Sequence, residues 1–322
     1  MRRLPPEPHD GVRANERRGS TTSWFTRTVL LITGPSGNVG REVVDILRAK
    51  PPGGPWRVAS RHPDQLRDSL AGAAQVCRFD LFDRSTWAET LRGVDTLFLL
   101  FPLPGNRAAR TAVIPFVEFA EHAGCRHVVY VSVFGADRAA FIPHYKVEAA
   151  LKASSMSWTL LRCGFFMQNL HRSISTHGSD IVERGELFIP AGRGRTSFLD
   201  ARDAADVAAR ALSNPAAHRN AIYHLTGPAA LTMSEVAAAL SAVLGHPVTY
   251  TRPGLMRFAI RLRRRGVGWD AIGFMAAVYT LTRLGQNQPI TDDVQRLLGR
   301  PPRTLEQFLR DSAWRWQQRA WT

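Results

Sequence analysis

Three glycines at fixed spacing follow an apolar run near the start of the chain, and they restrict the fold more than any other feature. Gly34, Gly37 and Gly40 stand in the segment GPSGNVG, directly after the buried-strand pattern TVLLIT of residues 28–33. Residues 38–50 then carry apolar side chains at helical spacing. A strand, a glycine turn and a helix in this order place backbone N–H groups and the positive end of the helix around a pyrophosphate. The segment therefore predicts a dinucleotide site, with a plain tight turn as the alternative.

The residues of this turn are the first expected contacts of the dinucleotide. Glycine at the first position permits the sharp turn, at the second the approach of the pyrophosphate, and at the third the close packing of helix on strand. The expected contacts are Gly34, Ser36, Gly37, Asn38, Val39 and Gly40.

Strand-like and helix-like segments alternate through the first half of the chain. Six apolar runs have the length of strands: 28–33, 56–60, 75–79, 95–101, 127–133 and 157–162. Continuous apolar strands connected by helices are typical of a parallel sheet covered on both faces, and right-handed crossovers make such a sheet doubly wound. We therefore expect an α/β fold with a Rossmann-type domain over 28–226 and a smaller, mostly helical C-terminal lobe over 227–322. The substrate cleft is expected between the two, and residues 1–27 are expected to form a disordered basic extension.

The second strand ends without an acidic residue, and this bears on which nicotinamide nucleotide is bound. An Asp or Glu at this point accepts a hydrogen bond from the ribose 2′-OH of NAD, whereas this chain has Ser60-Arg61-His62. The guanidinium of Arg61 can pair with a 2′-phosphate through several donors, so NADP(H) is favoured over NAD(H). Asp80, after the third strand, is expected at the adenine amino group. A solvated Arg61 and a surface Asp80 are the alternatives.

Several longer motifs occur in the order found in one known family. TGPSGNVGREVV is followed by ASRHP, by Phe79-Asp80-Leu81 and by DTLFLLFP, and later by VVYVSVFGA, HYKVEAALKAS and SWTLLRCGFFMQNL. In these motifs and in its C-terminal part the chain resembles the NmrA-like branch of the atypical short-chain dehydrogenases/reductases, over nearly all of residues 28–312. The resemblance implies an NAD(P)H-binding protein. Members of this family include quinone-reductase-like enzymes, ergot-alkaloid-pathway-type reductases and NADP-sensing regulators without catalysis.

The proton relay of ordinary short-chain reductases is missing from this chain. That relay needs Tyr-x-x-x-Lys on one helix face, whereas Tyr145 and Lys146 are adjacent and point about 100° apart on a helix. Lys146 stands where the resemblance places the family's single helix lysine, so we expect it at the nicotinamide ribose and near the substrate carbonyl. Tyr145 or His144 is the expected proton donor, and Ser132, at the end of the fifth strand, is expected to hydrogen-bond a substrate oxygen. The alternatives are a lysine paired with Glu148, packed aromatic side chains and a serine that only caps a loop.

Aromatic residues follow the strands that should border the cleft. Two sets of residues are expected to line it: Leu81, Phe101 and Pro102 along the cofactor, and Phe134, Phe165, Phe166 and Asn169 around the substrate. Such a wall suits a small, flat or aromatic molecule. Core packing is expected to account for at least one of the phenylalanines.

Composition argues against several other classes of protein. Cys77, Cys125 and Cys163 are far apart and lack CxxC spacing, which argues against a disulfide framework and a zinc cluster, and the histidines suggest no metal site. No GxSxG motif indicates a hydrolase, and no apolar run reaches the roughly 18 residues of a membrane span. The net charge of +15 is dispersed and comes without a zinc-finger or RNP signature, so no nucleic-acid partner is expected. A cytoplasmic monomer or homodimer is the default expectation.

One basic segment lies outside the dinucleotide motif. Residues 255–265 read LMRFAIRLRRR, and Arg257, Arg261 and Arg264 fall on one helical stripe. The pattern fits a lid over the cleft, a docking surface for an acidic partner or a membrane face, or a solvated helix face.

Together these features predict an NADP(H)-dependent reductase. A hydride would pass to a small aromatic or polycyclic quinone, enone, imine or ketone, and secondary metabolism is a context in which such substrates occur. Because Tyr-x-x-x-Lys is missing, a non-catalytic NADP(H)-binding redox sensor is the main alternative. A cofactor-assisted isomerase or cyclase is a further one.

Overall fold

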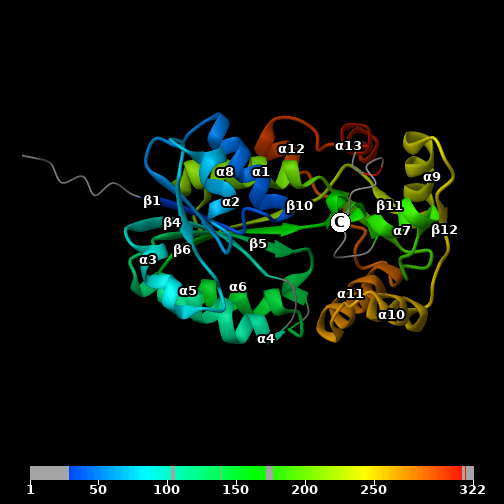
Figure 1. The fold of residues 1–322 in the computed structure, drawn as a ribbon, viewed down its shortest axis with the longest axis horizontal. Helices are drawn as coiled ribbons and strands as arrows, with labels where there is room; N and C mark the ends of the chain where they lie inside the picture. Colours follow the sequence, from blue (N-terminus) through cyan, green and yellow to red (C-terminus); the bar gives the residue numbers. More distant parts are fainter. Residues whose placement is uncertain (1–28, 103–105, 139, 172–176, 314–315, 317–322) are drawn as a thin grey trace, which may run out of the picture.

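The fold divides into a sheet lobe and a smaller lobe, which lie side by side in Figure 1. The computed structural model describes residues 29–102, 106–138, 140–171, 177–313 and 316. The extension predicted over 1–27 lies outside the described residues. No helix in the described part of the chain is long and apolar enough to cross a membrane.

A seven-stranded parallel sheet forms the centre of the sheet lobe. In spatial order its strands are β10 (Ala221–Leu225), β6 (Ser157–Cys163), β5 (His127–Val133), β4 (Val94–Leu100), β1 (Val29–Thr33), β2 (Trp56–Ser60) and β3 (Gln75–Arg78). The order reverses between β1 and β4, and the crevice outside the carboxyl ends of these strands is where such sheets bind ligands. Figure 1 shows that these ends face the smaller lobe. The predicted doubly wound α/β fold is therefore confirmed.

Helices cover both faces of the sheet because its strands are apolar on both sides. Leu30 and Ile32 of β1 pack into one core, and Leu31 between them packs into the other. The first face carries α1 (Asn38–Ala49), α2 (Asp64–Leu70), α8 (Ala201–Ser213) and α12 (Asp293–Leu298). The second face carries α3 (Trp87–Leu91), α5 (Ile114–His122) and α6 (Pro143–Ala153). The helix predicted over 107–123 is α4 (Asn106–Ala108), one π-helical stretch over 109–113, and α5.

The smaller lobe combines helices with two short sheets. One sheet has the order β11 (Ala230–Thr232), β9 (Arg195–Leu199), β7 (Phe165–Phe166), and the other pairs β12 (Thr249–Tyr250) with β8 (Glu186–Leu187). Its helices are α7 (His177–Arg184), α9 (Met233–Leu244), α10 (Leu255–Arg264), α11 (Trp269–Arg283) and α13 (Leu305–Ser312). They enclose a separate core that includes Phe198, Phe258 and Phe308.

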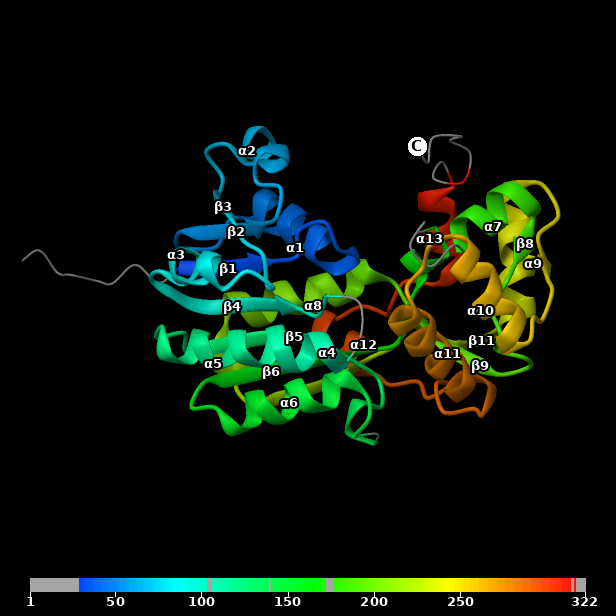
Figure 2. The same cartoon turned by 60° about the horizontal axis from the view of Figure 1, so that its bottom comes forward.

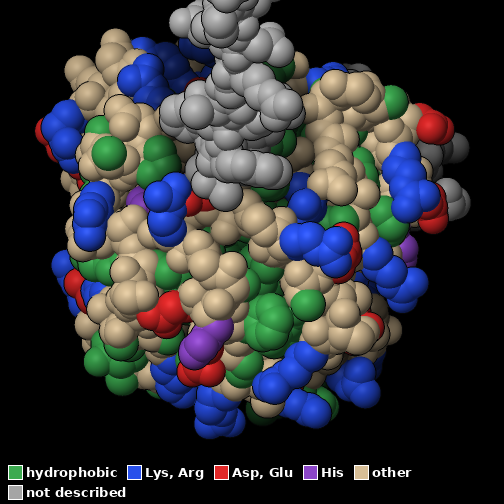
Figure 3. All heavy atoms as spheres, turned by 90° about the vertical axis from the view of Figure 1, so that its left-hand side faces the viewer, with side chains coloured by type: hydrophobic (Ala, Val, Ile, Leu, Met, Phe, Trp, Pro, Cys, Tyr) green, Lys and Arg blue, Asp and Glu red, His purple; other side chains and the backbone are tan. Residues whose placement is uncertain are grey.

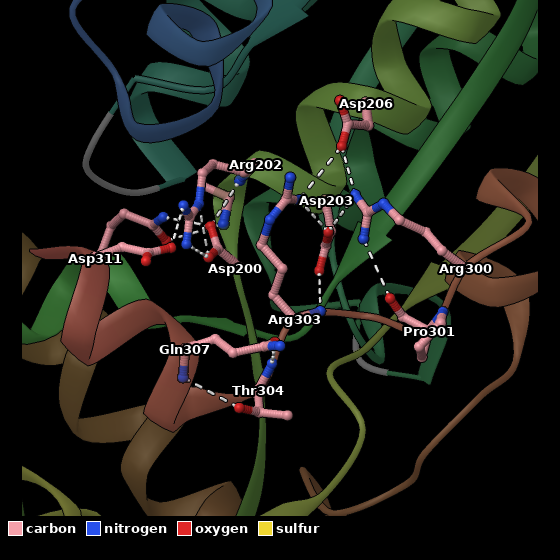
Figure 4. A network of polar contacts seen from close by, with 12 residues as sticks. Asp200, Arg202, Asp203, Asp206, Arg300, Pro301, Arg303, Thr304, Gln307 and Asp311 are labelled. Atoms are coloured by element: carbon pink, nitrogen blue, oxygen red, sulfur yellow. Dashed lines mark hydrogen bonds and ion pairs between the residues drawn. The ribbon is translucent and has the colours of Figure 1, made fainter.

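The chain returns from the smaller lobe to the sheet lobe through α12. This helix packs on α8 and β10, and the segment after it is tied down by arginines (Figure 4). Arg303 donates its backbone N–H to Asp203 at 2.8 Å and also pairs with it through its guanidinium. Arg300 lies 2.8 Å from the same carboxylate. Asp203 is fully buried, and a buried carboxylate needs such paired partners. The predicted sheet domain ends at residue 226. In the structure α12, from after that position, packs in the sheet lobe, and α7, from before it, packs in the smaller lobe.

Charged side chains are spread over the end of the sheet lobe that faces away from the smaller lobe. Figure 3 shows this end, with Lys and Arg side chains distributed over much of the surface and with Asp and Glu side chains among them. The part of this face that is visible beside the grey atoms presents no continuous basic surface.

Candidate active site

The glycine turn connects β1 to α1 through contacts that exclude any side chain. Gly34 has φ +63°, in the left-handed region, and a Cβ there would lie 2.9 Å from Leu100 Cδ1. A Cβ on Gly40 would lie only 2.1 Å from the carbonyl oxygen of Gly34. The N–H of Gly37 donates to that same oxygen at 2.9 Å. The first turn of α1 is therefore packed directly against the turn, as the motif predicts.

The N-terminus of α1 is built to receive an anion. Gly37 is its N-cap residue and supplies no side-chain cap, and the first turn contains no acidic residue. The first N–H groups of the helix, at its positive end, are therefore not capped by the side chain of the N-cap residue. Ser36 is exposed beside them, whereas the Val39 side chain is 2% exposed and packs in the core. Only the backbone of Val39 can therefore face a phosphate, and a pyrophosphate fits this cradle.

Residues at the ends of β2 and β3 lie together because these strands pair in parallel. Ser60 is in register with Arg78, so Arg61 and Asp80 follow at the same edge. Arg61 is exposed and has no ion-pair partner among the described residues. The Asp80 carboxylate accepts from the backbone N–H of Phe82 at 3.0 Å, and Leu81 between them is buried in the core. Arg61 is thus available to an added anion, while Leu81 supports the loop from inside.

His144 is turned into the protein interior. Its Nδ1 lies 2.7 Å from the hydroxyl of Tyr130 on β5, and its ring lies 4.6 Å from that of Phe101 after β4. Burial lowers the pKa of His144 to about 4, so the imidazole is neutral near pH 7. Phe101 and Pro102 are both half-buried at the end of β4. His144 therefore joins α6 to the wall expected along the cofactor.

The next two residues of α6 have different surroundings. Tyr145 is 39% exposed and Lys146 is half-buried. The three candidate catalytic residues at the start of α6 therefore differ in exposure: His144 is buried, Tyr145 is exposed and Lys146 is half-buried. They do not form the Tyr-x-x-x-Lys arrangement.

Ser132 is committed to a buried ion pair and does not point into open space. Its hydroxyl donates to Glu148 Oε1 at 2.6 Å, and Arg162 donates to the two oxygens of Glu148 at 3.1 and 2.6 Å. All three side chains are at most 3% exposed. Ser132 is expected from the sequence to hydrogen-bond a substrate oxygen. In the structure its hydroxyl proton is instead donated to Glu148. Glu148 also lies 3.7 Å from Lys152.

The residues expected around the substrate lie after β5 and β6, and one of them packs against the smaller lobe. Phe134, Phe165 and Phe166 are each half-buried. The ring of Phe165 packs 5.2 Å from Phe198 and 6.3 Å from Tyr279 of α11. The ring of Phe134 packs edge-on against that of His224, 5.5 Å away.

Two amide side chains join this segment to the dinucleotide side. Asn38, the first residue of α1, donates its side-chain N–H to Asn169 Oδ1 at 3.1 Å. The adjacent Gln168 donates to Asp200 at 2.8 Å and accepts from the N–H of Ala201 at 2.9 Å. Asp200 in turn pairs with Arg202, which reaches Asp311 of α13 (Figure 4). Hydrogen bonds and ion pairs therefore connect the start of α1, residues 168–169 after β6 and helix α13.

Several residues of this region carry no signal in the sequence. Gln168, Asp200 and the Glu148–Arg162 pair are nearly or fully buried, and the bonds from Gln168 to Asp200 and from Arg162 to Glu148 join residues 32 and 14 positions apart. Tyr279 is one of several aromatic residues in the apolar helix α11, and the sequence does not set it apart. Its ring nevertheless contacts Phe165, and its hydroxyl lies 2.7 Å from His177 Nε2. Among the described residues, no group of three or more His, Cys, Asp or Glu is placed to hold a metal ion.

Known proteins are similar to most of this chain in sequence and fold. Residues 34–215 match a family model described as NAD(P)H-binding. An NAD(P)H azoreductase from Xenophilus azovorans is 34% identical over 290 residues, which cover 88% of this chain and 98% of that protein. Agroclavine dehydrogenase from Claviceps fusiformis is 27% identical over 302 residues, which cover 90% and 99%. The NADPH complex of the quinone oxidoreductase QOR2 from Escherichia coli has a TM-score of 0.76 at 26% identity, with coverage of 88% and 98%.

Proposed function

Because the chain belongs to the NmrA-like, NAD(P)H-binding family of atypical short-chain dehydrogenases/reductases and is an NAD(P)H-dependent oxidoreductase, we propose that it uses NADPH to reduce a small, flat, conjugated acceptor. Quinones, azo compounds, enones, imines and ketones are the acceptors of this kind. The observation that carries the proposal is the glycine turn of Gly34, Gly37 and Gly40. It lies at the same sheet edge as the exposed Arg61, and Asn38 links it to Asn169, close in the chain to Phe165 and Phe166.

The preference for NADPH depends on the end of β2. No carboxylate stands there to accept from a ribose 2′-OH, and a 2′-phosphate would give the Arg61 guanidinium a negatively charged partner. Asp80 would hold the adenine amino group with the carboxylate oxygen that Phe82 leaves available. The QOR2 structure of Escherichia coli was solved with NADPH, which supports the same choice here.

The residues of the chain position the reactants, and the nicotinamide supplies the hydride when the cofactor is bound. The N–H groups at the start of α1 would hold the pyrophosphate, and Lys146 would hold the nicotinamide ribose. Phe134 and Phe166 hold the acceptor flat, and Asn169 orients its polar atom. His144 is a poor proton donor near pH 7 because its pKa is about 4. We therefore assign the proton to Tyr145, which precedes Lys146 in α6 and is 39% exposed.

A steady-state assay tests the proposal. Purified protein is given NADPH with a naphthoquinone, a small azo dye or a cyclic enone, and both NADPH consumption and reduced product are measured. Lys146→Met is expected to lower kcat/KM by about 100-fold, and Tyr145→Phe also by about 100-fold, at the lower end of the range for general acid catalysis. Arg138→Gln, at an exposed position after β5, serves as the control.

One observation favours the alternative of a sensor without catalysis. The Ser132 hydroxyl is bound to Glu148, so the strand-five serine does not serve a substrate in this structure. Tight NADPH binding without consumption by any acceptor would establish the sensor and overturn the proposed reduction.

A further inference from the structure

Helix α10 presents an exposed face that mixes apolar and basic side chains. Met256 is 76% exposed and Ile260 is 44% exposed. They are four positions apart and therefore adjacent on the helix surface. Arg257, Arg263 and Arg264 are exposed as well and, at 100° per residue, flank the two apolar side chains. We call these five residues the α10 outer face.

The opposite side of α10 holds the helix to the smaller lobe. Phe258 and Leu262 are fully buried in its core. Arg261 pairs with Asp180 at 3.1 Å and with Glu186 at 2.5 Å, and its guanidinium lies 3.3 Å from the ring centre of Phe188. The predicted stripe of Arg257, Arg261 and Arg264 is therefore divided, because Arg261 is used inside the lobe.

The three arginines of the α10 outer face keep their charges unbalanced. Neither Arg257, Arg263 nor Arg264 has an ion-pair partner in the part of the chain that the structure describes. Trp269, which begins α11 just after α10, is 64% exposed and adds a large apolar side chain to the same hairpin. In Figures 1 and 2, α11 lies nearer to the sheet lobe than α10 does. This position of α11 argues against α10 as a lid on the sheet lobe.

We propose that the α10 outer face docks on the surface of an anionic phospholipid membrane. Arginines bind headgroup phosphates, while exposed Met and Ile side chains between them enter the apolar boundary below the headgroups. A second copy of this chain is a poor partner, because matching faces would set arginine against arginine. An acidic protein surface would pair with the arginines but would have to cover Met256 and Ile260 with apolar groups of its own. The net charge of +15 adds a general attraction to anionic surfaces.

Vesicle binding tests the proposal with a matched pair of charge variants. The full chain is sedimented with phosphatidylcholine vesicles that contain phosphatidylglycerol, and with vesicles of phosphatidylcholine alone. Arg257→Gln with Arg264→Gln is expected to weaken binding to the anionic vesicles about 30-fold, from the usual effect of two basic residues near a charged surface. Arg78→Gln with Arg219→Gln removes the same charge at exposed positions on the sheet lobe and is expected to change binding less than about threefold.

A second variant separates lipid from other anions. Met256→Ser with Ile260→Ser is expected to weaken vesicle binding about tenfold or more, since two apolar side chains leave the interface, while binding of NADPH stays as in the wild type. Polyglutamate serves as a soluble polyanion. The proposal is overturned if the wild type does not sediment with anionic vesicles, or if both charge variants lose binding equally. It is also overturned if the serine variant binds vesicles normally while polyglutamate displaces them, which would indicate an acidic protein partner.

Discussion

Replacing Gly40 with alanine tests whether the glycine turn depends on close backbone approach. The added Cβ would lie 2.1 Å from the carbonyl oxygen of Gly34 and 2.9 Å from its carbonyl carbon. Both atoms belong to the backbone, so no change of rotamer can relieve the contact. The first turn of α1 must move away from the glycine turn by about 1 Å before ordinary packing is restored.

The size of the effect follows from this displacement. Overpacking of this kind costs about 1–3 kcal/mol, which lowers the melting temperature by several degrees in a chain of this size. The same movement displaces the N–H groups at the start of α1, and hydrogen bonds weaken steeply when their geometry is lost. Loss of one charge-assisted hydrogen bond to a phosphate weakens NADPH binding by about 10- to 100-fold.

Thermal melting and a fluorescence titration with NADPH measure both effects. Gly273→Ala is the control because it makes the same chemical change within α11, at an exposed position where a Cβ meets no atom within 4 Å. It should raise stability by about 0.5–1 kcal/mol and leave NADPH binding as it is. If Gly40→Ala binds NADPH as tightly as the wild type and melts no earlier, the reasoning about the turn is refuted.

Three further predictions concern the residues around the site. Glu148→Gln leaves the buried Arg162 with only the partly exposed Asp137, 3.0 Å away, as a counter-charge and should lower the free energy of unfolding in urea by about 2–3 kcal/mol; a loss below about 1 kcal/mol would contradict the buried pair. His144 has an ordinary pKa of 6.5 and a folded pKa of about 4, so the unfolded chain binds more protons between these values and stability should fall as pH drops from about 6.5 toward 4. His144→Gln should reduce that dependence in pH-dependent melting without abolishing it, because burial also lowers the pKa of His127 to about 4 and that of His177 to about 3; an unchanged slope would argue against the assignment. Asn169→Leu breaks the bond to Asn38 and should raise KM for the acceptor several-fold with little change in stability; equal effects on stability and KM would indicate a purely structural role.

The sheet lobe could be predicted from the sequence because its signals are local. Each buried strand is a short apolar run, and the glycine turn is confined to seven consecutive residues between a strand and a helix. The absence of an acid after β2 is equally local, so the sequence alone is enough to single out Arg61 as a candidate cofactor contact.

The hydrogen bonds that join the glycine turn, the segment after β6 and the start of α8 could not be predicted in this way. Asn38 and Asn169 are 131 positions apart, and Gln168 and Asp200 are 32 apart, so no short pattern links them. The contact of Ser132 with Glu148, only 16 positions away, could not be predicted from the sequence either. The place of Ser132 at the end of β5 follows from the apolar run before it, but whether its hydroxyl faces a substrate or Glu148 depends on how α6 packs across the sheet.

The preference of the site for NADPH tests the central claim most directly. NADPH and NADH are titrated against wild type, Arg61→Ala and the exposed control Arg219→Ala, with nucleotide fluorescence as the readout. We predict that the wild type and the control bind NADPH at least about tenfold more tightly than NADH, and that Arg61→Ala loses this preference because the 2′-phosphate has lost its charge partner. Equal binding of both nucleotides by the wild type, or binding of neither, would contradict the account.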